Sequence, residues 1–198
     1  GVGVSAVNAV SEYLKLESKR EGKVWMQEYG RGAPKGPLLP KGEASTTGTK
    51  VRFKPDPTIF SITEFSFETL ASRLRELAFL NAGLIIDLVD ERGEGRTERY
   101  LYRGGIQEFV ALLNKSKEPL HEEVIGLSAS SDAGADGKQM GAPVTVDVAM
   151  QWNASYTEAI YCYTNNIHNK DGGTHLTGIR AALTKTVNQY GTSQNLFK

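Results

Sequence analysis

Several kinds of residue and segment are scarce or missing in this 198-residue chain, which has a single cysteine, Cys162, and three histidines. One cysteine cannot form an intramolecular disulfide, and so few thiol and imidazole ligands argue against a structural zinc site. No apolar run approaches the ~18 residues that a membrane-spanning helix needs, and no basic stretch followed by an apolar core marks a signal peptide. These absences favour a protein of the reducing cytoplasm that does not enter a membrane.

An excess of charge is also missing, because 23 Lys and Arg residues balance 23 Asp and Glu residues. A zero net charge argues against capture of nucleic acid by the field of the whole domain, although it does not bear on a local basic patch. Hydrophobic residues at 39% and charged residues at 23% are typical of a globular protein with a core. The chain does not begin with methionine, and we expect it to be a piece of a longer protein.

The spacing of apolar residues predicts an α+β fold in two lobes that divide near Gly105. Helical spacing predicts helices over residues 5–14, 66–81, 106–116 and 171–191, the first capped by Ser5. Period-two alternation predicts hairpins over residues 14–29, 83–105 and 144–167, and a short strand over 49–55. Two glycine-rich stretches, 30–48 and 128–143, read as loops. On the last helix we expect a buried side made of Leu176, Ile179, Leu183 and Val187.

One motif carries a recognisable chemistry, the "GVGVS" of residues 1–5. Two glycines ahead of a predicted helix allow backbone amides, and the free N–H groups of the first helical turn, to face an anion. The pattern indicates a phosphate cradle, but a plain glycine turn has the same pattern. A dinucleotide-binding fold is disfavoured because the third glycine and a preceding strand are missing. A Walker-type loop is excluded because no Gly-Lys-Ser/Thr follows.

A series of longer strings resembles the B subunits of bacterial DNA gyrase, which are type II topoisomerases. In order, they are "GVGVSAVNAVSEYL", "REGKVWMQEY", "TGTKVRFKPDPTIF", "TEFSFETLASRLRELAFLNAG", "VDVAMQWN" and "DGGTHLTGIRAALT". The resemblance runs through the whole chain except the variable stretch 129–143. The string "RLRELAFLN" is more similar to gyrase than to its decatenating relative, topoisomerase IV.

The resemblance implies two domains. Residues 1–105 would be the C-terminal part of a nucleotide-binding domain, an incomplete two-layer α+β sandwich of the ATPase type shared by Hsp90, gyrase, histidine kinases and MutL. Residues 106–198 would be the first part of the transducer domain, an α+β fold similar to ribosomal protein S5.

The resemblance also implies roles for particular residues. Gly1, Val2 and Gly3 would wrap the triphosphate of a bound nucleotide, and Val4 and Ser5 would start the helix beneath it. Thr49 would bind adenine through its hydroxyl and a water, and Val51 would form an apolar wall beside the base. Arg20 would form the rim of the pocket that aminocoumarin antibiotics engage, and Arg180 and Lys185 would line a DNA channel. The residues alone leave plainer readings open: a strand threonine for Thr49, a solvated turn charge for Arg20, and a solvated helix face for Arg180 and Lys185.

For the whole protein, the resemblance implies ATP and Mg²⁺ as cofactors, and as partners the gyrase A subunit, double-stranded DNA, a second B subunit and aminocoumarin inhibitors. The family's glutamate base, magnesium-binding asparagine and adenine-reading aspartate precede the glycine loop, and its γ-phosphate lysine lies beyond Lys198. We therefore expect no catalytic or metal-binding residue in this chain, no tight nucleotide binding and no ATPase activity. The alternatives are a non-catalytic interaction module or another ATPase of the same fold, such as the topoisomerase IV B subunit, MutL or an Hsp90 relative.

Overall fold

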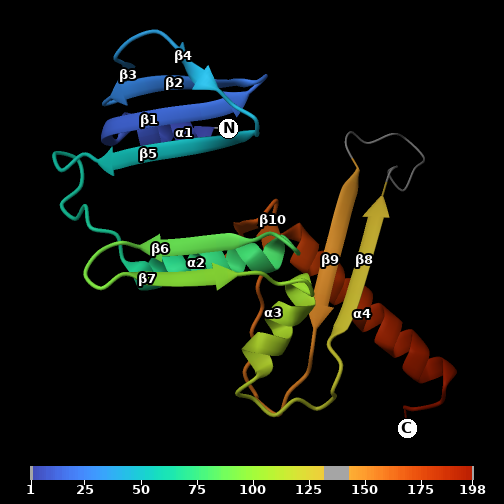
Figure 1. Ribbon diagram of the computed structural model, residues 1–198. Coiled ribbons are helices and arrows are strands. Elements are labelled where there is room, and N and C mark those ends of the chain that lie inside the picture. The colour runs from blue at the N-terminus through green and yellow to red at the C-terminus, as the bar shows by residue number, and fades with distance from the viewer. Residues whose placement is uncertain (1, 132–142, 198) are drawn as a thin grey trace. The chain divides into compact units, whose positions relative to one another are not determined.

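The computed structural model describes residues 2–131 and 143–197 (Figure 1). Contacts between residues divide the chain into two compact units, Gly1–Ser66 and Phe67–Lys198. The units do not divide at Gly105, where the sequence predicts a boundary between lobes. Gly105 lies inside the second unit because the ring of Phe79 stacks on that of Phe109 across this position, at 4.9 Å between centroids.

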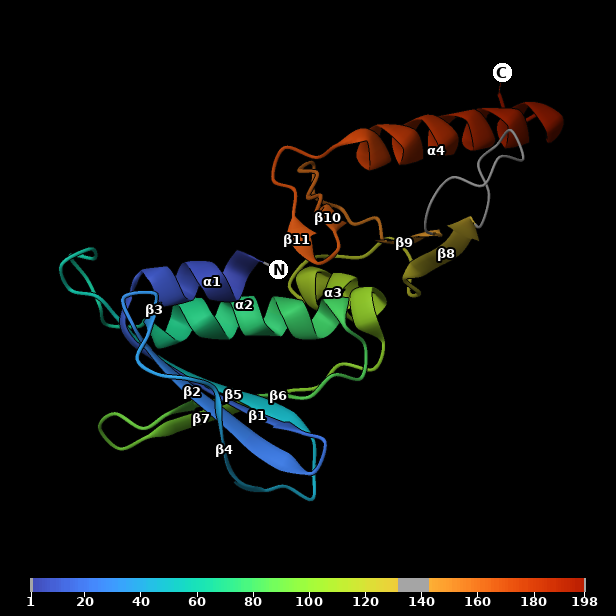
Figure 2. The ribbon, with the colours of Figure 1, turned by 90° about the horizontal axis from the view of Figure 1, so that it is seen from above.

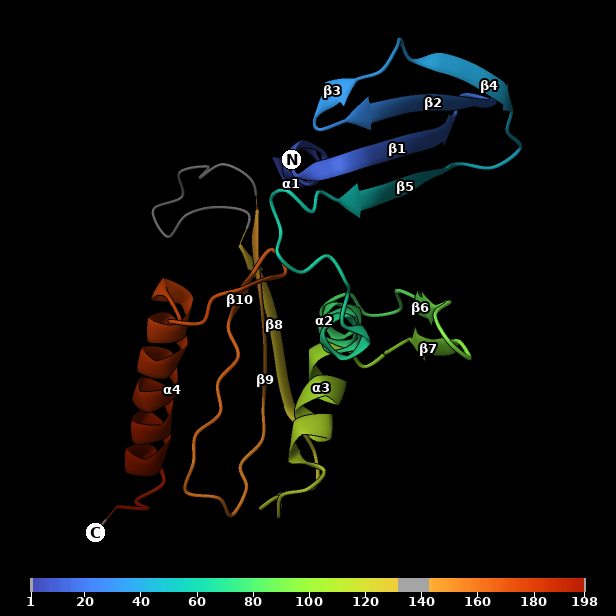
Figure 3. The ribbon, with the colours of Figure 1, turned by 90° about the vertical axis from the view of Figure 1, so that its left-hand side faces the viewer.

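The first unit is a helix against an antiparallel sheet of five strands. The elements are α1 (Val2–Ala9), β1 (Ser11–Arg20), β2 (Lys23–Gly30), β3 (Ala33–Pro34), β4 (Leu39–Glu43) and β5 (Gly48–Pro55). Figure 2 shows α1 along one side of the sheet. In Figure 3, β1 lies between β2 and β5, and β3 and β4 both pair with β2. Leu14 on the central strand is only 2% exposed and anchors this small core.

The hairpin predicted over residues 14–29 is confirmed, and its turn explains why its register is well defined. Glu21 and Gly22 both have positive φ, 55° and 73°, and they separate the paired residues Arg20 and Lys23. Two positive φ angles in a two-residue loop are those of a type I′ turn, whose twist matches that of the flanking strands. The strand predicted over 49–55 is also confirmed, as β5.

Two expectations for this unit are wrong. The helix predicted over 5–14 is instead α1, which ends at Ala9, so Ser5 lies inside it and Leu14 lies on a strand. Residues 11–14 form a strand despite their helical spacing because β1 pairs with β2 on one edge and β5 on the other. The two ladders satisfy the hydrogen-bonding groups of its backbone. The long loop predicted over 30–48 contains β3 and β4, which find partners on β2.

The second unit contains α2 (Phe67–Leu80), β6 (Ile86–Asp90), β7 (Arg96–Tyr100), α3 (Gly105–Asn114), β8 (Ile125–Ser131), β9 (Val144–Met150), β10 (Tyr163–Thr164), β11 (Ile167–His168) and α4 (Thr174–Ser193). The strands pair as β6–β7, β8–β9 and β10–β11. The β6–β7 hairpin lies along α2 in Figure 1, and Ala71, Ala78 and Tyr100 form the buried cluster between them. The apolar stripe of α2 was predicted from its spacing, and so were α3, α4 and the β6–β7 hairpin.

Three expectations for the second unit need correction. No hairpin spans 144–167: β9 pairs with β8, from Ile125 opposite Met150 to Ser131 opposite Val144. Residues 128–131, predicted as part of a loop, are strand, because backbone pairing with β9 outweighs the weak strand propensity of Ser and Ala. The remainder of that predicted loop, 132–142, lies outside the described residues. On α4, Leu183 is 36% and Val187 54% exposed, so the expected buried side is covered only near Leu176 and Ile179.

A buried carboxylate closes the first unit where α1, β2 and β5 end. Asp56 is 1% exposed, and its Oδ2 accepts a hydrogen bond from Arg31 Nε at 2.6 Å. Its Oδ1 accepts bonds from the Thr58 backbone N–H at 2.9 Å and from Thr58 Oγ1 at 2.7 Å. Hydrogen bonds from Arg31 and Thr58 stabilise the charged form and lower the pKa of Asp56 to about 2.

This lowered pKa predicts how stability depends on pH. A carboxyl group whose pKa is depressed from 3.8 to about 2 contributes stability above pH 4 that is lost as the pH falls toward 2. We expect Asp56→Asn to lower the urea midpoint near neutral pH. The difference in urea midpoint between the original chain and the variant should then shrink as the pH falls from 4 toward 2. Urea unfolding followed by circular dichroism measures it, with the exposed Asp171→Asn as the matched control, and a pH-independent gap would contradict the assignment.

Candidate nucleotide site

Strand pairing in the first unit brings three of the predicted site residues, Thr49, Val51 and Arg20, onto one face of the sheet. Thr49 lies opposite Ser18, Val51 opposite Leu16 and Phe53 opposite Leu14. Directly opposed residues in antiparallel strands project to the same side, and side chains two apart share a face. We call this side the apolar face; its described strand positions on β1 and β5 are Leu14, Leu16, Ser18, Arg20, Thr49, Val51 and Phe53.

The apolar face is open to a ligand at Thr49 and Val51. Thr49 is exposed and Val51 is 40% exposed, whereas Leu14 at the other end of the row is buried. Phe53 is covered in part by an edge-on contact with Phe65, whose ring centroid is 5.9 Å away. A hydroxyl beside an uncovered apolar wall is a combination that suits a flat, partly polar ring such as a nucleobase.

The residues predicted to form a phosphate loop are helical where the structure describes them. Val2 and Gly3 belong to the first turn of α1, and Val4 and Ser5 follow in the same helix. Val2 is 85% and Val4 56% exposed, and a Cβ added to Gly3 would meet no atom within 4 Å. The first turn therefore presents its unpaired backbone N–H groups to open space, where an anion can approach. Gly1, the first residue of the predicted loop, lies outside the described residues.

Arg20 ends β1 beside the hairpin turn, on the apolar face. Its Nε lies 3.3 Å from Glu21 Oε1, and the two side chains are 76% and 75% exposed. An ion pair this exposed contributes little stability, so it does not commit Arg20 to a structural role. The guanidinium is free to reorient toward a ligand at the end of the row.

The two residues predicted for a DNA channel lie on α4 in the second unit. Arg180 Nη2 donates to Glu158 Oε2 at 2.7 Å, and Lys185 is exposed further along the same helix. The pairing with Glu158 reduces the positive charge that Arg180 offers, and both arginine and glutamate side chains are more than half exposed. Both residues therefore lie at solvent-exposed positions of α4.

The apolar face can bind, but its strand positions do not supply a base. No carboxylate occupies the positions of this face on β1, β2 and β5, and the one on β4, Glu43, lies opposite Lys23 at its edge. Among residues 2–131 and 143–197, no three His, Cys, Asp or Glu side chains gather into a group that could hold a metal ion. These residues fit the base and phosphates of a nucleotide, and they do not fit its metal.

Counting residues along the paired strands could have identified two residues of the apolar face that the sequence analysis missed, Ser18 and Trp25. Ser18 lies opposite Thr49 on one side and opposite Trp25 on the other, so the three share the apolar face. The turn at Glu21 and Gly22 fixes the register of β1 with β2, and counting back from it places Ser18 beside Trp25. Their partnership with Thr49 depends on the pairing of β5 with β1, which no local signal specifies.

Comparison with known proteins gives consistent results. A profile of the DNA gyrase B family matches residues 105–198. The DNA gyrase B protein of Bacillus mycoides is 44% identical over the whole chain, which covers 47% of that protein, and its counterpart in Halalkalibacterium halodurans is 46% identical, with 30% of it covered. The chain thus spans less than half the length of these relatives. No helix in the described ranges is long and apolar enough to cross a membrane.

A solved structure also matches the whole chain. It is the crystal structure of the 43K ATPase domain of Thermus thermophilus gyrase B in complex with an aminocoumarin, with a TM-score of 0.82 and 37% identity, and the chain covers 52% of it. Both the sequence similarity and the structural match therefore cover the whole chain. The chain belongs to the DNA gyrase B family and corresponds to the ATPase-domain region of its members.

Proposed function

We propose that this chain supplies part of the nucleotide site, and the first part of the transducer, of an ATP-driven type II topoisomerase. In the whole protein, ATP binding and hydrolysis would close a dimer of B subunits and drive the passage of one DNA duplex through another, giving negative supercoiling. The observation that carries the proposal is the apolar face, which carries Thr49, Val51 and Arg20.

Each residue of the proposed nucleotide site has a role that follows from its position. Val51 forms an apolar wall against the adenine ring, and the Thr49 hydroxyl can donate or accept a hydrogen bond at its polar edge. The first turn of α1, from Val2 to Ser5, directs backbone N–H groups at the triphosphate. Bound ATP would arrive with Mg²⁺, and the groups that hold the metal and activate the attacking water would lie outside these residues.

The second part of the proposal concerns the rest of the protein. Residues 1–105 and 106–198 would be the functional divisions, nucleotide-binding domain and transducer, although the compact units divide after Ser66. Arg180 and Lys185 on α4 would face duplex DNA, and the partner in strand passage would be the gyrase A subunit. The setting would be the bacterial cytoplasm, and no membrane partner is proposed.

The first experiment is a calorimetric titration of the 198-residue chain with a non-hydrolysable ATP analogue and Mg²⁺. We expect a dissociation constant weaker than about 1 mM, because β1 and β5 bring no carboxylate to the apolar face beside Thr49 and the described residues form no metal-binding cluster. We also expect no steady ATP hydrolysis. The intact protein, titrated in the same way, is the positive control. Micromolar binding or turnover by the chain alone would contradict the assignment of the missing groups.

A substitution of Thr49 tests the adenine-binding side of the site. In the intact protein, Thr49→Ala should weaken binding of the ATP analogue by about threefold to tenfold, the effect of losing one hydrogen bond. Thr49→Ser keeps the hydroxyl and should retain most of the affinity. Thr47→Ala, in the exposed loop before β5, is the matched control. Equal effects of the Thr47 and Thr49 variants would remove Thr49 from the site.

A substitution of Arg20 tests the rim of the same site. The related structure holds an aminocoumarin, and we expect Arg20→Ala to weaken aminocoumarin binding about tenfold or more, since hydrogen bonds from a guanidinium are charge-assisted. Arg20→Lys should restore only part of the affinity because it loses the planar fork. Lys19→Ala, whose side chain projects to the other face of the sheet, should change binding little. Titration of each variant with an aminocoumarin measures the effect, and unchanged binding by Arg20→Ala would contradict the proposed role of Arg20 at the rim.

A further inference from the structure

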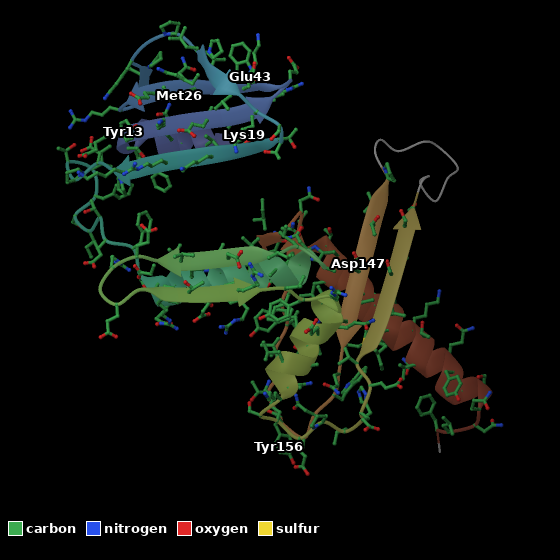
Figure 4. All side chains as sticks on the ribbon, viewed as in Figure 1. Tyr13, Lys19, Met26, Glu43, Asp147 and Tyr156 are labelled. Carbon is green, nitrogen blue, oxygen red and sulfur yellow. The ribbon has the colours of Figure 1, made fainter. Side chains whose placement is uncertain are left out.

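The sheet of the first unit has a second face with a different composition. Residues that alternate with the apolar face project to this side: Tyr13 opposite Lys54, Lys15 opposite Arg52, and Glu17 opposite Lys50. Figure 4 labels Tyr13 and Lys19, near the two ends of this row on β1. We call this side the basic face and define it by its cations, Lys15, Lys19, Lys50, Arg52 and Lys54.

Charge is distributed unevenly between the two units although the whole chain is neutral. The first unit, Gly1–Ser66, has ten Lys and Arg residues against seven Asp and Glu residues, and the second has thirteen against sixteen. Half of the cations of the first unit lie on the basic face. The sheet therefore concentrates positive charge on one surface, which the composition of the whole chain conceals.

Three of the five cations have no ion pair among the described contacts. Lys15 Nζ lies 2.8 Å from Glu17 Oε1, and Lys54 Nζ lies 2.6 Å from Glu12 Oε1. The other three, Lys19, Lys50 and Arg52, are exposed. Their charges are therefore available to an anion that approaches this side of the sheet.

The basic face also carries two carboxylates, and they do not cancel its charge. Glu28 on β2 lies opposite Lys15 and accepts a hydrogen bond from the Tyr13 hydroxyl at 3.5 Å. A hydrogen bond from Lys15, and then the charges of Lys15, Lys50 and Lys19, lower the pKa of Glu17. Glu17 thus lies in a positive field, and the five cations outnumber these two acids together with Glu12, which pairs with Lys54.

The geometry of the basic face suits a regular polyanion. Side chains two apart on a strand repeat about every 7 Å, and neighbouring strands lie about 4.8 Å apart, so the cations are attached to the sheet at regular intervals. Single-stranded nucleic acid would call for aromatic platforms on which bases stack. The only aromatic side chain at the described strand positions of this face is Tyr13, and it is already occupied, with Lys35 Nζ 5.4 Å from its ring centroid. The phosphates of a duplex need no stacking.

We infer that the basic face is a sequence-independent docking surface for the backbone of double-stranded DNA, with Lys19, Lys50 and Arg52 as its principal phosphate contacts. The choice of DNA among polyanions rests on the proposed function of the whole protein in strand passage. Because the apolar face lies on the other side of the sheet, DNA on the basic face and a nucleotide beside Thr49 do not compete for the same side chains.

The test is binding of the full chain to a fluorescent mixed-sequence duplex of about 20 base pairs, measured by anisotropy over a range of salt concentrations without nucleotide. Neutralising the three cations together, as Lys19→Gln, Lys50→Gln and Arg52→Gln, should weaken binding at low salt by about tenfold or more. The slope of log K against log salt should become shallower by about 2 to 3, because three phosphate contacts are lost. Circular dichroism confirms the fold of each variant.

The matched control removes two lysines and one arginine from exposed positions of the second unit, as Arg103→Gln, Lys115→Gln and Lys170→Gln. This variant should keep both the affinity and the slope, and so should Lys19→Arg, Lys50→Arg and Arg52→Lys, which preserve the charge. Equal losses in the control, an unchanged slope in the test variant, or loss of heparin binding with duplex binding intact would overturn the inference. Thr49→Ala should not alter duplex binding, so failure here is distinct from failure of the nucleotide site.

Discussion

The buried carboxylate of Asp56 holds together three segments on which the first unit depends. It accepts hydrogen bonds from Arg31, in the turn after β2, and from Thr58, while its backbone N–H donates to the Val10 carbonyl between α1 and β1. The backbone N–H of Arg31, a residue with a positive φ of 49°, donates to the carbonyl oxygen of Ser11. A carboxylate that is almost fully buried is costly unless every bond is made. This requirement fixes where α1 meets the sheet, and with it the position of the proposed phosphate-binding turn.

The central strand β1 gives the sheet two chemically different faces. Leu14 and Leu16 face one side with Val51, and Lys15 and Lys19 face the other. Because the side chains of a strand alternate, a slip of one residue would exchange the two faces, and the turn at Glu21 and Gly22 opposes such a slip. One register thus positions both the proposed nucleotide site and the proposed DNA surface.

In the second unit, packing runs continuously through the point where the family profile begins. Gly105 starts α3 with a positive φ of 57°, and a Cβ there would lie 3.4 Å from the Cβ of Ala82 and 3.6 Å from the Phe79 carbonyl oxygen. These are ordinary contact distances, so a side chain at this position would be disfavoured by the strain of the positive φ. Around this position Phe79 stacks on both Tyr102 and Phe109.

The sequence by itself determined the elements whose signals are local. The stripe of α2, the hairpin of β1 and β2, the β6–β7 hairpin and the strings that resemble the gyrase family all consist of residues close together in the chain. Only the tertiary structure decided that Leu14 belongs to a strand, that β8 rather than residues 158–167 pairs with β9, and that Thr49 shares a face with Ser18 and Trp25. Each of those outcomes depends on hydrogen bonding between strands distant in sequence. Such pairing can override a helical spacing or a weak strand propensity, and no local pattern records which partner a strand will find.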